Sequence, residues 1–315
     1  MRQSPDVSIC ECFARDGLQH EAKIIPAHQK IELLNRLSKL GFDRVEASSY
    51  SNPKVIPQFA DVSEVMAGMD RQVGVSYKAT CANPRAVERA IGDLQAGYGA
   101  TEISMLVSAS ESHSDRNLKR SRAAQWENID EMLALAKTKF KVIGTISVAF
   151  GCPFEGHVDP KAVLKDVETF AVKGVRFVNI ADTTGLATPR SVRTMVRQVL
   201  SDFPDVTPIM HFHDTRGTAL VNCVAALEAG GAHFDSAIGG VGGHPAGVRY
   251  GGGYTGNVCT EDLVNLFESM GVATGIHLDG LMEVAHYCES LLERRLNSRT
   301  VVSGYHSALT KKITL

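Results

Sequence analysis

Two histidines that lie two residues apart, His211 and His213, carry the clearest chemical signal in the sequence. They follow β-forming residues and precede a turn-forming segment at 214–217. Side chains alternate along a strand, so both imidazoles point to the same side of it. Together with oxygen ligands from elsewhere they would suit Mg²⁺, Mn²⁺ or Zn²⁺. A polar core position explains the same pair without a metal.

Other polar residues occupy equivalent places at the ends of β-rich segments. Arg15 and Asp16 follow the first segment, Glu46 lies inside the second, and Asp182 ends the sixth. A buried carboxylate such as Glu46 is costly unless it is paired or bound, so we interpret it as functional. Asp16 also fits a simple turn, and Asp182 also fits a helix cap.

The elements that must position these residues alternate along the chain. Strands are expected near 7–13, 44–49, 74–81, 102–107, 142–149, 176–181, 208–213 and 234–238. Helices are expected near 27–40, 61–69, 84–97, 124–139, 160–173, 188–202, 218–229 and 260–270. Eight strand–helix units without a reversal predict an α/β fold, a (β/α)8 TIM barrel, whose catalytic groups gather at the C-terminal ends of its strands.

The barrel accounts for nearly the whole chain. An additional C-terminal helix is expected near 278–296, inside a helical extension of about 278–315. Helix signals support the alternation, because Pro follows a capping residue at Asn83 and Thr188, and Gly41 and Gly174 end helices. We therefore interpret residues 1–315 as a single catalytic domain.

Composition narrows the class of protein. The 315 residues carry a net charge of −2 and are 44% apolar, which favours neither nucleic acid nor a membrane as the partner. Seven cysteines without a C-x-x-C pair indicate free thiols in a reducing compartment, and we predict a cytoplasmic protein. Cys10 and Cys12 alternate along the first strand, where they are soft metal ligands or small buried residues.

A glycine-rich segment follows the eighth strand and ends at Asn257. It contains no G-x-x-x-x-G-K-[ST] pattern, so we interpret it as a lid over the barrel mouth and not as a P-loop. Asn257 directly precedes a helix, where an amide is also a common N-cap.

Several segments together resemble the hydroxymethylglutaryl-CoA lyase family of metal-dependent TIM-barrel enzymes. They lie at 15–19 (RDGLQ), 45–49 (VEASS), 52–58, 151–156 (GCPFEG), 182–185 (DTTG), 211–215 (HFHDT) and 256–263. The resemblance extends from about residue 8 to 295. It implies cleavage of a thioester like 3-hydroxy-3-methylglutaryl-CoA to acetyl-CoA and a 3-oxo acid, with a CoA thioester as the bound partner and a homo-oligomer as the usual state.

The resemblance also implies a role for individual residues. Asp16, His211, His213 and Asn257 match the ligands of a divalent cation, usually Mg²⁺ or Mn²⁺. Arg15 matches the residue that stabilises the enolate formed from the thioester.

Further positions match groups around the cation and the acyl chain. Glu46 and Asp182 match carboxylates near the metal and its water, and Asp182 is a candidate for proton transfer. Gln19 and Ser49 are expected to shape the polar pocket around the acyl group.

The lid departs from the family pattern. His244 follows the paired glycines where the lyases carry a cysteine. An imidazole can act as acid or base near neutral pH, so His244 either takes over the role of the thiol or is a surface residue. Three alternatives stay open: another 3-hydroxyacyl-CoA as substrate, a condensing enzyme acting on a 2-oxo acid and acetyl-CoA, and a catalytically silent binding barrel.

Overall fold

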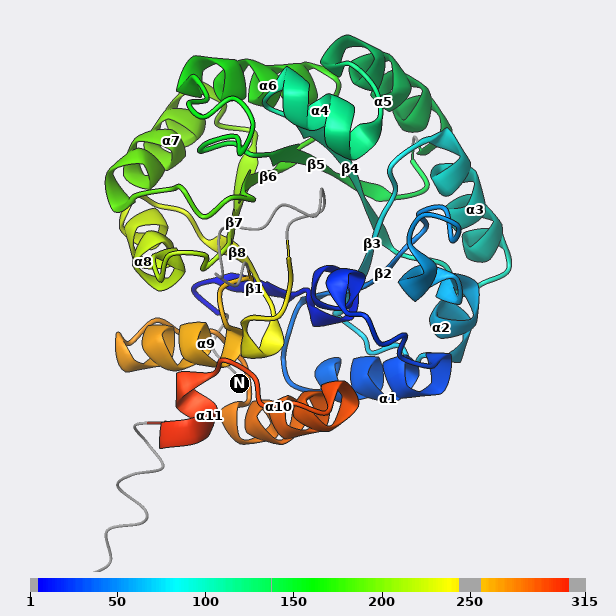
Figure 1. Cartoon of the computed structure of the whole chain (residues 1–315), viewed down its shortest axis with the longest axis vertical. Coiled ribbons are helices and arrows are strands. Elements are labelled where there is room, and N and C mark those ends of the chain that lie inside the picture. Colours follow the sequence, from blue (N-terminus) through cyan, green and yellow to red (C-terminus); the bar gives the residue numbers. More distant parts are fainter. Residues whose placement is uncertain (1–4, 137, 244–255, 306–315) are drawn as a thin grey trace, which may run out of the picture.

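Eight parallel strands close into one barrel in chain order, with helices around the outside (Figure 1). The computed structural model describes residues 5–136, 138–243 and 256–305. The strands are β1 (Ser8–Glu11), β2 (Arg44–Ser49), β3 (Ser76–Thr80), β4 (Glu102–Ser108), β5 (Lys141–Ser147), β6 (Phe177–Asp182), β7 (Thr207–Phe212) and β8 (His233–Ser236). The predicted (β/α)8 barrel is confirmed.

Helices connect the strands and continue beyond the last one. The connecting helices are α1 (Ala27–Leu37), α2 (Val62–Gly68), α3 (Pro84–Gln95), α4 (Glu111–Leu118), α5 (Arg122–Ala136), α6 (Pro160–Val172), α7 (Pro189–Asp202) and α8 (Ala219–Glu228). After β8 come α9 (Thr260–Ser269), α10 (Leu278–Leu292) and α11 (Arg299–Ser303). The predicted C-terminal helix therefore corresponds to α10, with the short α11 after it.

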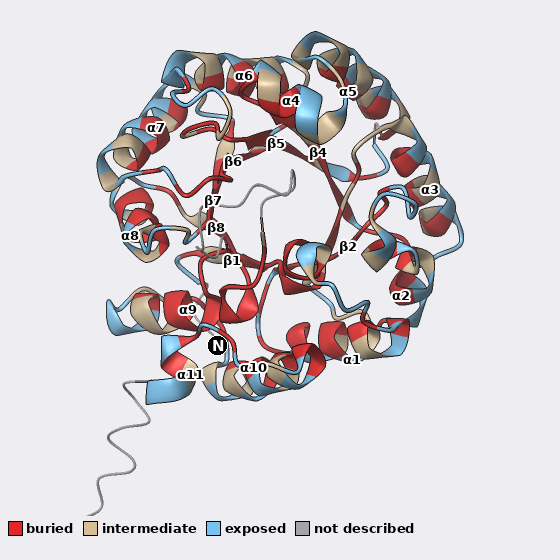
Figure 2. Cartoon of the chain, in the orientation of Figure 1, coloured by how far each residue is buried: buried red, intermediate tan, exposed pale blue. Residues whose placement is uncertain are grey.

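Helix caps and strand pairing explain why the chain closes. The Asn83 side chain accepts a hydrogen bond from the Ala86 amide, and Thr188 forms a capping box with Ser191. β1 pairs with β8 over four residues, which closes the ring. The helices turn buried residues towards the strands and exposed residues outward (Figure 2), so the main apolar core lies between the sheet and the helices.

Charged residues occupy the inside of the barrel. The Arg44 Nε lies 2.5 Å from a Glu102 oxygen, and the Lys78 Nζ lies 3.4 Å from oxygens of both Glu46 and Asp235. All five side chains are at most 5% exposed. Because a buried charge is tolerated only when it is paired, these ion pairs form a polar network beneath the barrel mouth.

Two segments near the mouth differ from the sequence-based prediction. The first strand ends at Glu11, and the chain then forms a π-helical turn, η1 (Phe13–Gly17), in which the Cys12 carbonyl accepts the amides of Arg15, Asp16 and Gly17. Helix α4 was not expected, because its sequence is polar and only His113 and Ser114 are buried. Its start depends on a side-chain cap and not on apolar periodicity.

None of the helices in the described part of the chain is both long and apolar enough to cross a membrane.

Candidate active site

A cavity of about 160 Å³ opens at the C-terminal ends of the strands. Its polar wall is formed by Arg15, Asp16, Gln19, Ser51, Lys78, Thr80, Ser104, Asn117, Thr145, Ser147, Asn179, Thr183, His211 and His213. Five apolar side chains, Ile56, Ala82, Leu106, Leu118 and Ala181, complete the wall. The position agrees with the end of the barrel at which such folds carry their active sites.

Three predicted ligands lie together at this mouth. His211 is the penultimate residue of β7, His213 lies just beyond the strand, and η1 presents Asp16. The two Nε2 atoms are 3.1 Å apart, and the His213 Nε2 lies 3.7 Å from an Asp16 oxygen. One ligand atom from each of the three residues lies within 4.8 Å of those from the others, and all three residues are buried. The metal prediction thus has a compact donor set.

Asn257, the fourth predicted ligand, joins this group from a distant part of the chain. It forms an isolated antiparallel bridge with His213. Its Nδ2 donates to an Asp16 oxygen at 2.6 Å and to the Val241 carbonyl at 2.9 Å. Among the described residues its buried Oδ1 has no hydrogen-bond partner. An amide oxygen left in this way beside a carboxylate and two imidazoles is what a divalent cation would satisfy.

The geometry of the donors fits a hexacoordinate cation. Ligands at about 2.1 Å on neighbouring vertices of an octahedron lie about 3.0 Å apart, close to the separation of the two imidazole nitrogens. Two nitrogens, a carboxylate and an amide oxygen form a mixed set that suits Mg²⁺ or Mn²⁺ and also permits Zn²⁺. The residues present therefore fit the implied metal.

Asp235 of β8 orients the imidazole of His211. One Asp235 oxygen lies 3.2 Å from the His211 Nδ1 and also accepts a hydrogen bond from Asn179 at 2.6 Å. A carboxylate on Nδ1 fixes the tautomer that leaves Nε2 free to bind a cation and makes the ring a better ligand. Sequence reasoning missed Asp235 and Lys78, although a charge in the middle of a barrel strand is the same signal that identified Glu46. It also missed Asn179, whose neutral amide gives no such signal.

Arg15 links the donor group to Glu46. Its Nε lies 2.7 Å from a Glu46 oxygen, and its Nη1 donates to Asp16 at 2.8 Å. The same Glu46 oxygen accepts a hydrogen bond from the Thr80 hydroxyl at 2.7 Å, and its other oxygen faces Lys78. The guanidinium is therefore held on two sides at the wall of the cavity.

Electrostatics keep the site ionised. Burial alone would raise the pKa of Asp16, but Arg15 and the two histidines outweigh it and hold that pKa well below its usual range. Burial likewise opposes ionisation of Glu46, yet Arg15 and Lys78 lower its pKa. Both carboxylates are therefore charged near neutral pH, and Asp16 is ready to bind a cation without losing a proton.

Asp182 lies beside the site and is tied to a turn. Its two oxygens accept the backbone amides of Leu186 and Ala187 at 2.8 and 3.0 Å, and it does not line the cavity. Burial raises the pKa of Asp182 to about 6. Asp214 accepts the Ala219 amide in the same manner, so capping explains the repeated Asp-Thr-x-Gly pattern. A part in proton transfer stays a prediction for Asp182.

The two predicted pocket residues occupy different positions. Gln19 lines the cavity, with its amide nitrogen 3.3 Å from the His20 ring. Ser49 is buried, and its hydroxyl contacts the Ser51 hydroxyl at 2.7 Å and the Thr80 carbonyl at 3.2 Å. Ser51 lines the cavity, so Ser49 supports the wall from behind.

The start of the glycine-rich segment packs against the donor group, while His244 falls outside the described residues. A Cβ on Gly242 would lie 2.4 Å from the Asn257 Nδ2 and 3.2 Å from an Asp16 oxygen. A Cβ on Gly243 would lie 2.8 Å from the His20 ring. Only glycine lets the backbone pass this close.

Comparison with known proteins agrees with this geometry. The HMGL-like family matches residues 6–288. Hydroxymethylglutaryl-CoA lyase YngG of Bacillus subtilis is 36% identical over 94% of this chain and 96% of its own length. The cytoplasmic 3-hydroxy-3-methylglutaryl-CoA lyase of Rattus norvegicus is 34% identical over 96% of this chain and 86% of its own length.

A solved structure extends the comparison to the fold. An HMG-CoA lyase from Acinetobacter baumannii, in complex with coenzyme A and 3-methylmalate, superimposes with a TM-score of 0.90 at 36% identity and covers 98% of both chains. The match to the family extends over most of the sequence and the whole barrel. The chain belongs to the HMGL-like family.

Proposed function

We propose that this protein is a divalent-metal-dependent carbon–carbon lyase that cleaves 3-hydroxy-3-methylglutaryl-CoA to acetyl-CoA and acetoacetate. The observation that carries the proposal is the buried donor group of Asp16, His211, His213 and Asn257 beside Arg15. Relatives in the same family carry this activity in their names, and one was solved with coenzyme A.

The metal would be held by Asp16, His211, His213 and the Oδ1 of Asn257. A divalent cation bound there supplies Lewis-acid chemistry that lowers the pKa of the substrate's tertiary hydroxyl. Asp235 contributes by fixing the His211 ring through its Nδ1. We favour Mg²⁺ or Mn²⁺ because no thiolate belongs to this set, and Zn²⁺ remains a candidate.

Arg15 stabilises the charge that develops during cleavage. When the bond between C2 and C3 breaks, negative charge moves onto the thioester oxygen as the enolate forms. The guanidinium lies at the cavity wall and is held by Glu46 and Asp16, so it needs no reorganisation as that charge appears. One well-placed donor of this kind contributes about 3 kcal/mol to the transition state.

The cavity suits a short, polar acyl group. Hydroxyl and amide side chains from several strands line it, with Gln19 at its edge and Ser49 behind Ser51. These groups offer hydrogen bonds to a carboxylate, and the small volume of about 160 Å³ leaves little room for a long alkyl chain. This composition supports a hydroxy diacid thioester.

The enolate must finally receive a proton at C2. We assign His244 as the candidate acid, because it stands in the sequence where the lyases carry a lid cysteine, and an imidazole is suited to proton transfer near neutral pH. Asp182 is the second candidate, because its pKa of about 6 permits it to exchange a proton. The predicted single domain, homo-oligomer and cytoplasmic location stay predictions.

The direct test is release of acetyl-CoA from 3-hydroxy-3-methylglutaryl-CoA with Mg²⁺, with Mn²⁺ and with a chelator. We expect metal-dependent release by the wild type and a large loss in His244→Ala. A panel of other 3-hydroxyacyl-CoA thioesters run in parallel fixes the acyl specificity. If the metal-loaded protein cleaves another thioester but not this one, the proposed substrate is wrong. If activity appears only in His244→Cys, the lid is adapted to a different acyl group.

A further inference from the structure

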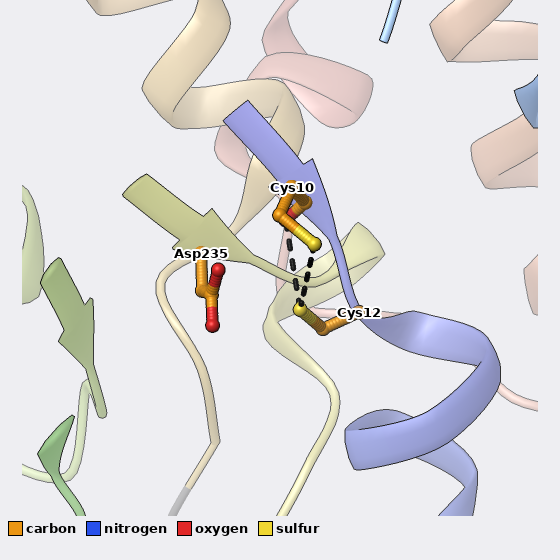
Figure 3. A group of neighbouring side chains, drawn as sticks. All are labelled: Cys10, Cys12 and Asp235. Carbon is orange, nitrogen blue, oxygen red and sulfur yellow. Dashed lines mark hydrogen bonds between the residues drawn. The ribbon is translucent and has the colours of Figure 1, made fainter. Parts of the chain in front are cut away.

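Two thiols and a carboxylate meet inside the barrel, beneath the site described above. Cys10 lies on β1, Cys12 follows it, and Cys10 is paired in register with Asp235 of β8. Figure 3 shows the two cysteines turned towards each other with Asp235 beside them. One ligand atom from each residue lies within 4.8 Å of those from the other two, and all three residues are at most 1% exposed.

The separation of the two sulfur atoms matches a tetrahedral thiolate site. The Cys10 and Cys12 Sγ atoms are 3.8 Å apart. Zinc binds thiolate at about 2.3 Å, so two sulfur atoms on a tetrahedral ion lie about 3.8 Å from each other. The sulfur pair therefore needs almost no rearrangement to accept such an ion.

Asp235 supplies a third donor that the catalytic site does not use. Its Oδ2 faces Lys78, Asn179 and His211. Its Oδ1 is buried and lacks a hydrogen-bond partner within the described part of the chain. A buried carboxylate oxygen left without a partner is costly, and a cation beside the two sulfur atoms would satisfy it. Three protein ligands leave one tetrahedral position for a further donor.

The local charge also suits a divalent cation. Two thiolates, one carboxylate and a divalent ion together carry a charge of −1, and the Lys78 ammonium lies 3.4 Å from Asp235 and 3.4 Å from Glu46. Burial raises the pKa of the Cys12 thiol above its usual value. Binding of the ion as a dithiolate forms two metal–sulfur bonds and releases to solvent any proton that the two thiols hold.

We propose that Cys10, Cys12 and Asp235 form a second cation site, selective for thiophilic ions such as Zn²⁺, which inhibits the enzyme when it is occupied. Thiolate ligands discriminate against Mg²⁺ and Mn²⁺, which prefer oxygen. Coupling to the catalytic centre follows from Asp235, because a cation on its Oδ1 withdraws charge from the carboxylate that supports His211. The affinity of the catalytic site for Mn²⁺ then falls about 10- to 100-fold, the range seen when the partner of a metal-binding histidine is lost.

Co²⁺ is the probe that separates the two sites. The Asp16 group contains no sulfur, so a thiolate-to-cobalt charge-transfer band in the near ultraviolet reports on cysteine ligands and not on the catalytic donors. Among the described residues, Cys10 and Cys12 are the cysteines that belong to a candidate metal group. With reduced wild type saturated with Mg²⁺, we expect this band to grow slowly, because the site is buried, and to disappear when Zn²⁺ displaces cobalt. Growth of the band does not require lyase activity, so its absence tests this site separately from the proposed reaction.

Substitutions complete the test. Cys10→Val and Cys12→Val keep apolar volume and should abolish the band, whereas Cys223→Val removes a buried free thiol on α8 and should keep it. Circular dichroism and thermal unfolding confirm that each variant is folded. If a valine variant does not fold, Cys12→Ser is used in its place. The Zn²⁺ concentration that halves Mn²⁺ binding should rise at least about tenfold in the Cys10 and Cys12 variants alone.

A wild-type protein without the charge-transfer band would overturn the proposal. So would a band that persists in both the Cys10 and Cys12 variants. Zinc inhibition that is equal in wild type and Cys12→Val would overturn the coupling, because the inhibitory ion would then act at the catalytic donors.

Discussion

Replacing Arg15 by methionine removes the guanidinium at the cavity wall and keeps a side chain of similar length. Arg15 is held at 2.7 Å by Glu46 and at 2.8 Å by Asp16, and its side chain is 17% exposed. Losing a fixed donor at the developing enolate costs about 3 kcal/mol, so kcat should fall about 10²- to 10³-fold. Arg15→Lys should lose less, because an ammonium keeps the charge but not the planar fork.

The substitution also breaks a partly buried ion pair, which costs up to about 3–5 kcal/mol of stability when the partner charge is left alone. Glu46 keeps Lys78 and Thr80, so the loss for Arg15→Met should be at the low end. Arg122→Met is the matched control, because Arg122 pairs with buried Asp166 at 2.6 Å and does not line the cavity.

The assay is release of acetyl-CoA from 3-hydroxy-3-methylglutaryl-CoA with saturating Mn²⁺, together with thermal unfolding of each variant. We expect Arg122→Met to lose stability and keep kcat, and Arg15→Met to lose kcat out of proportion to its stability. Two results would refute the reasoning: kcat of Arg15→Met within tenfold of the wild type, or an equal loss of kcat in both methionine variants.

Three further predictions concern the groups around Arg15. Lys78→Met should lower the free energy of unfolding by about 3–5 kcal/mol in denaturant titration, because it leaves Asp235 and Glu46 short of a buried counter-charge. The control Lys165→Met, at an exposed lysine, should change this free energy by less than about 0.5 kcal/mol. Similar losses in both variants would contradict the buried network. Asp182 has a native pKa of about 6 against about 3.9 in the unfolded chain, so it holds its proton more tightly in the native state. Its contribution to stability should therefore fall by up to about 3 kcal/mol as the pH rises from about 4 through 6. Asp182→Asn should make the free energy of unfolding less dependent on pH in this range, and an unchanged dependence would contradict the assignment. Excess Mn²⁺ at 100 times its dissociation constant should stabilise the wild type by about 2.7 kcal/mol and leave Asp16→Asn nearly unshifted in thermal unfolding; an equal shift in both would remove Asp16 from the metal site.

Strand order and the positions of His211 and His213 could be predicted from the sequence because they depend on local patterns. The alternation of side chains along β7 places the two imidazoles on the same side of the strand. Eight repeats of strand and helix favour a closed barrel. Asn257 could be assigned only through the family resemblance, because its approach to His213 depends on an isolated bridge between segments far apart in the chain.

The network under the site could not be predicted in the same way. Lys78, Asn179 and Asp235 lie on three different strands, and their contacts depend on the stagger of the barrel, which no single segment encodes. The π-helical turn that presents Arg15 and Asp16 also lacks a sequence pattern, since it rests on three amides sharing the Cys12 carbonyl. A charged residue inside a predicted strand was the one sequence signal for this network, and only Glu46 was identified from it.

The most direct measurement of the central claim follows Mn²⁺ binding and product formation in the same titration. Metal-free wild type is titrated with Mn²⁺ while the bound ion is counted by electron paramagnetic resonance and acetoacetate is assayed from 3-hydroxy-3-methylglutaryl-CoA. We predict that activity rises in proportion to the first bound ion and that His211→Ala loses both, whereas His286→Ala on the exposed face of α10 keeps both. Cleavage that continues in metal-free protein, or tight binding of Mn²⁺ that is unaffected in His211→Ala, would contradict the account.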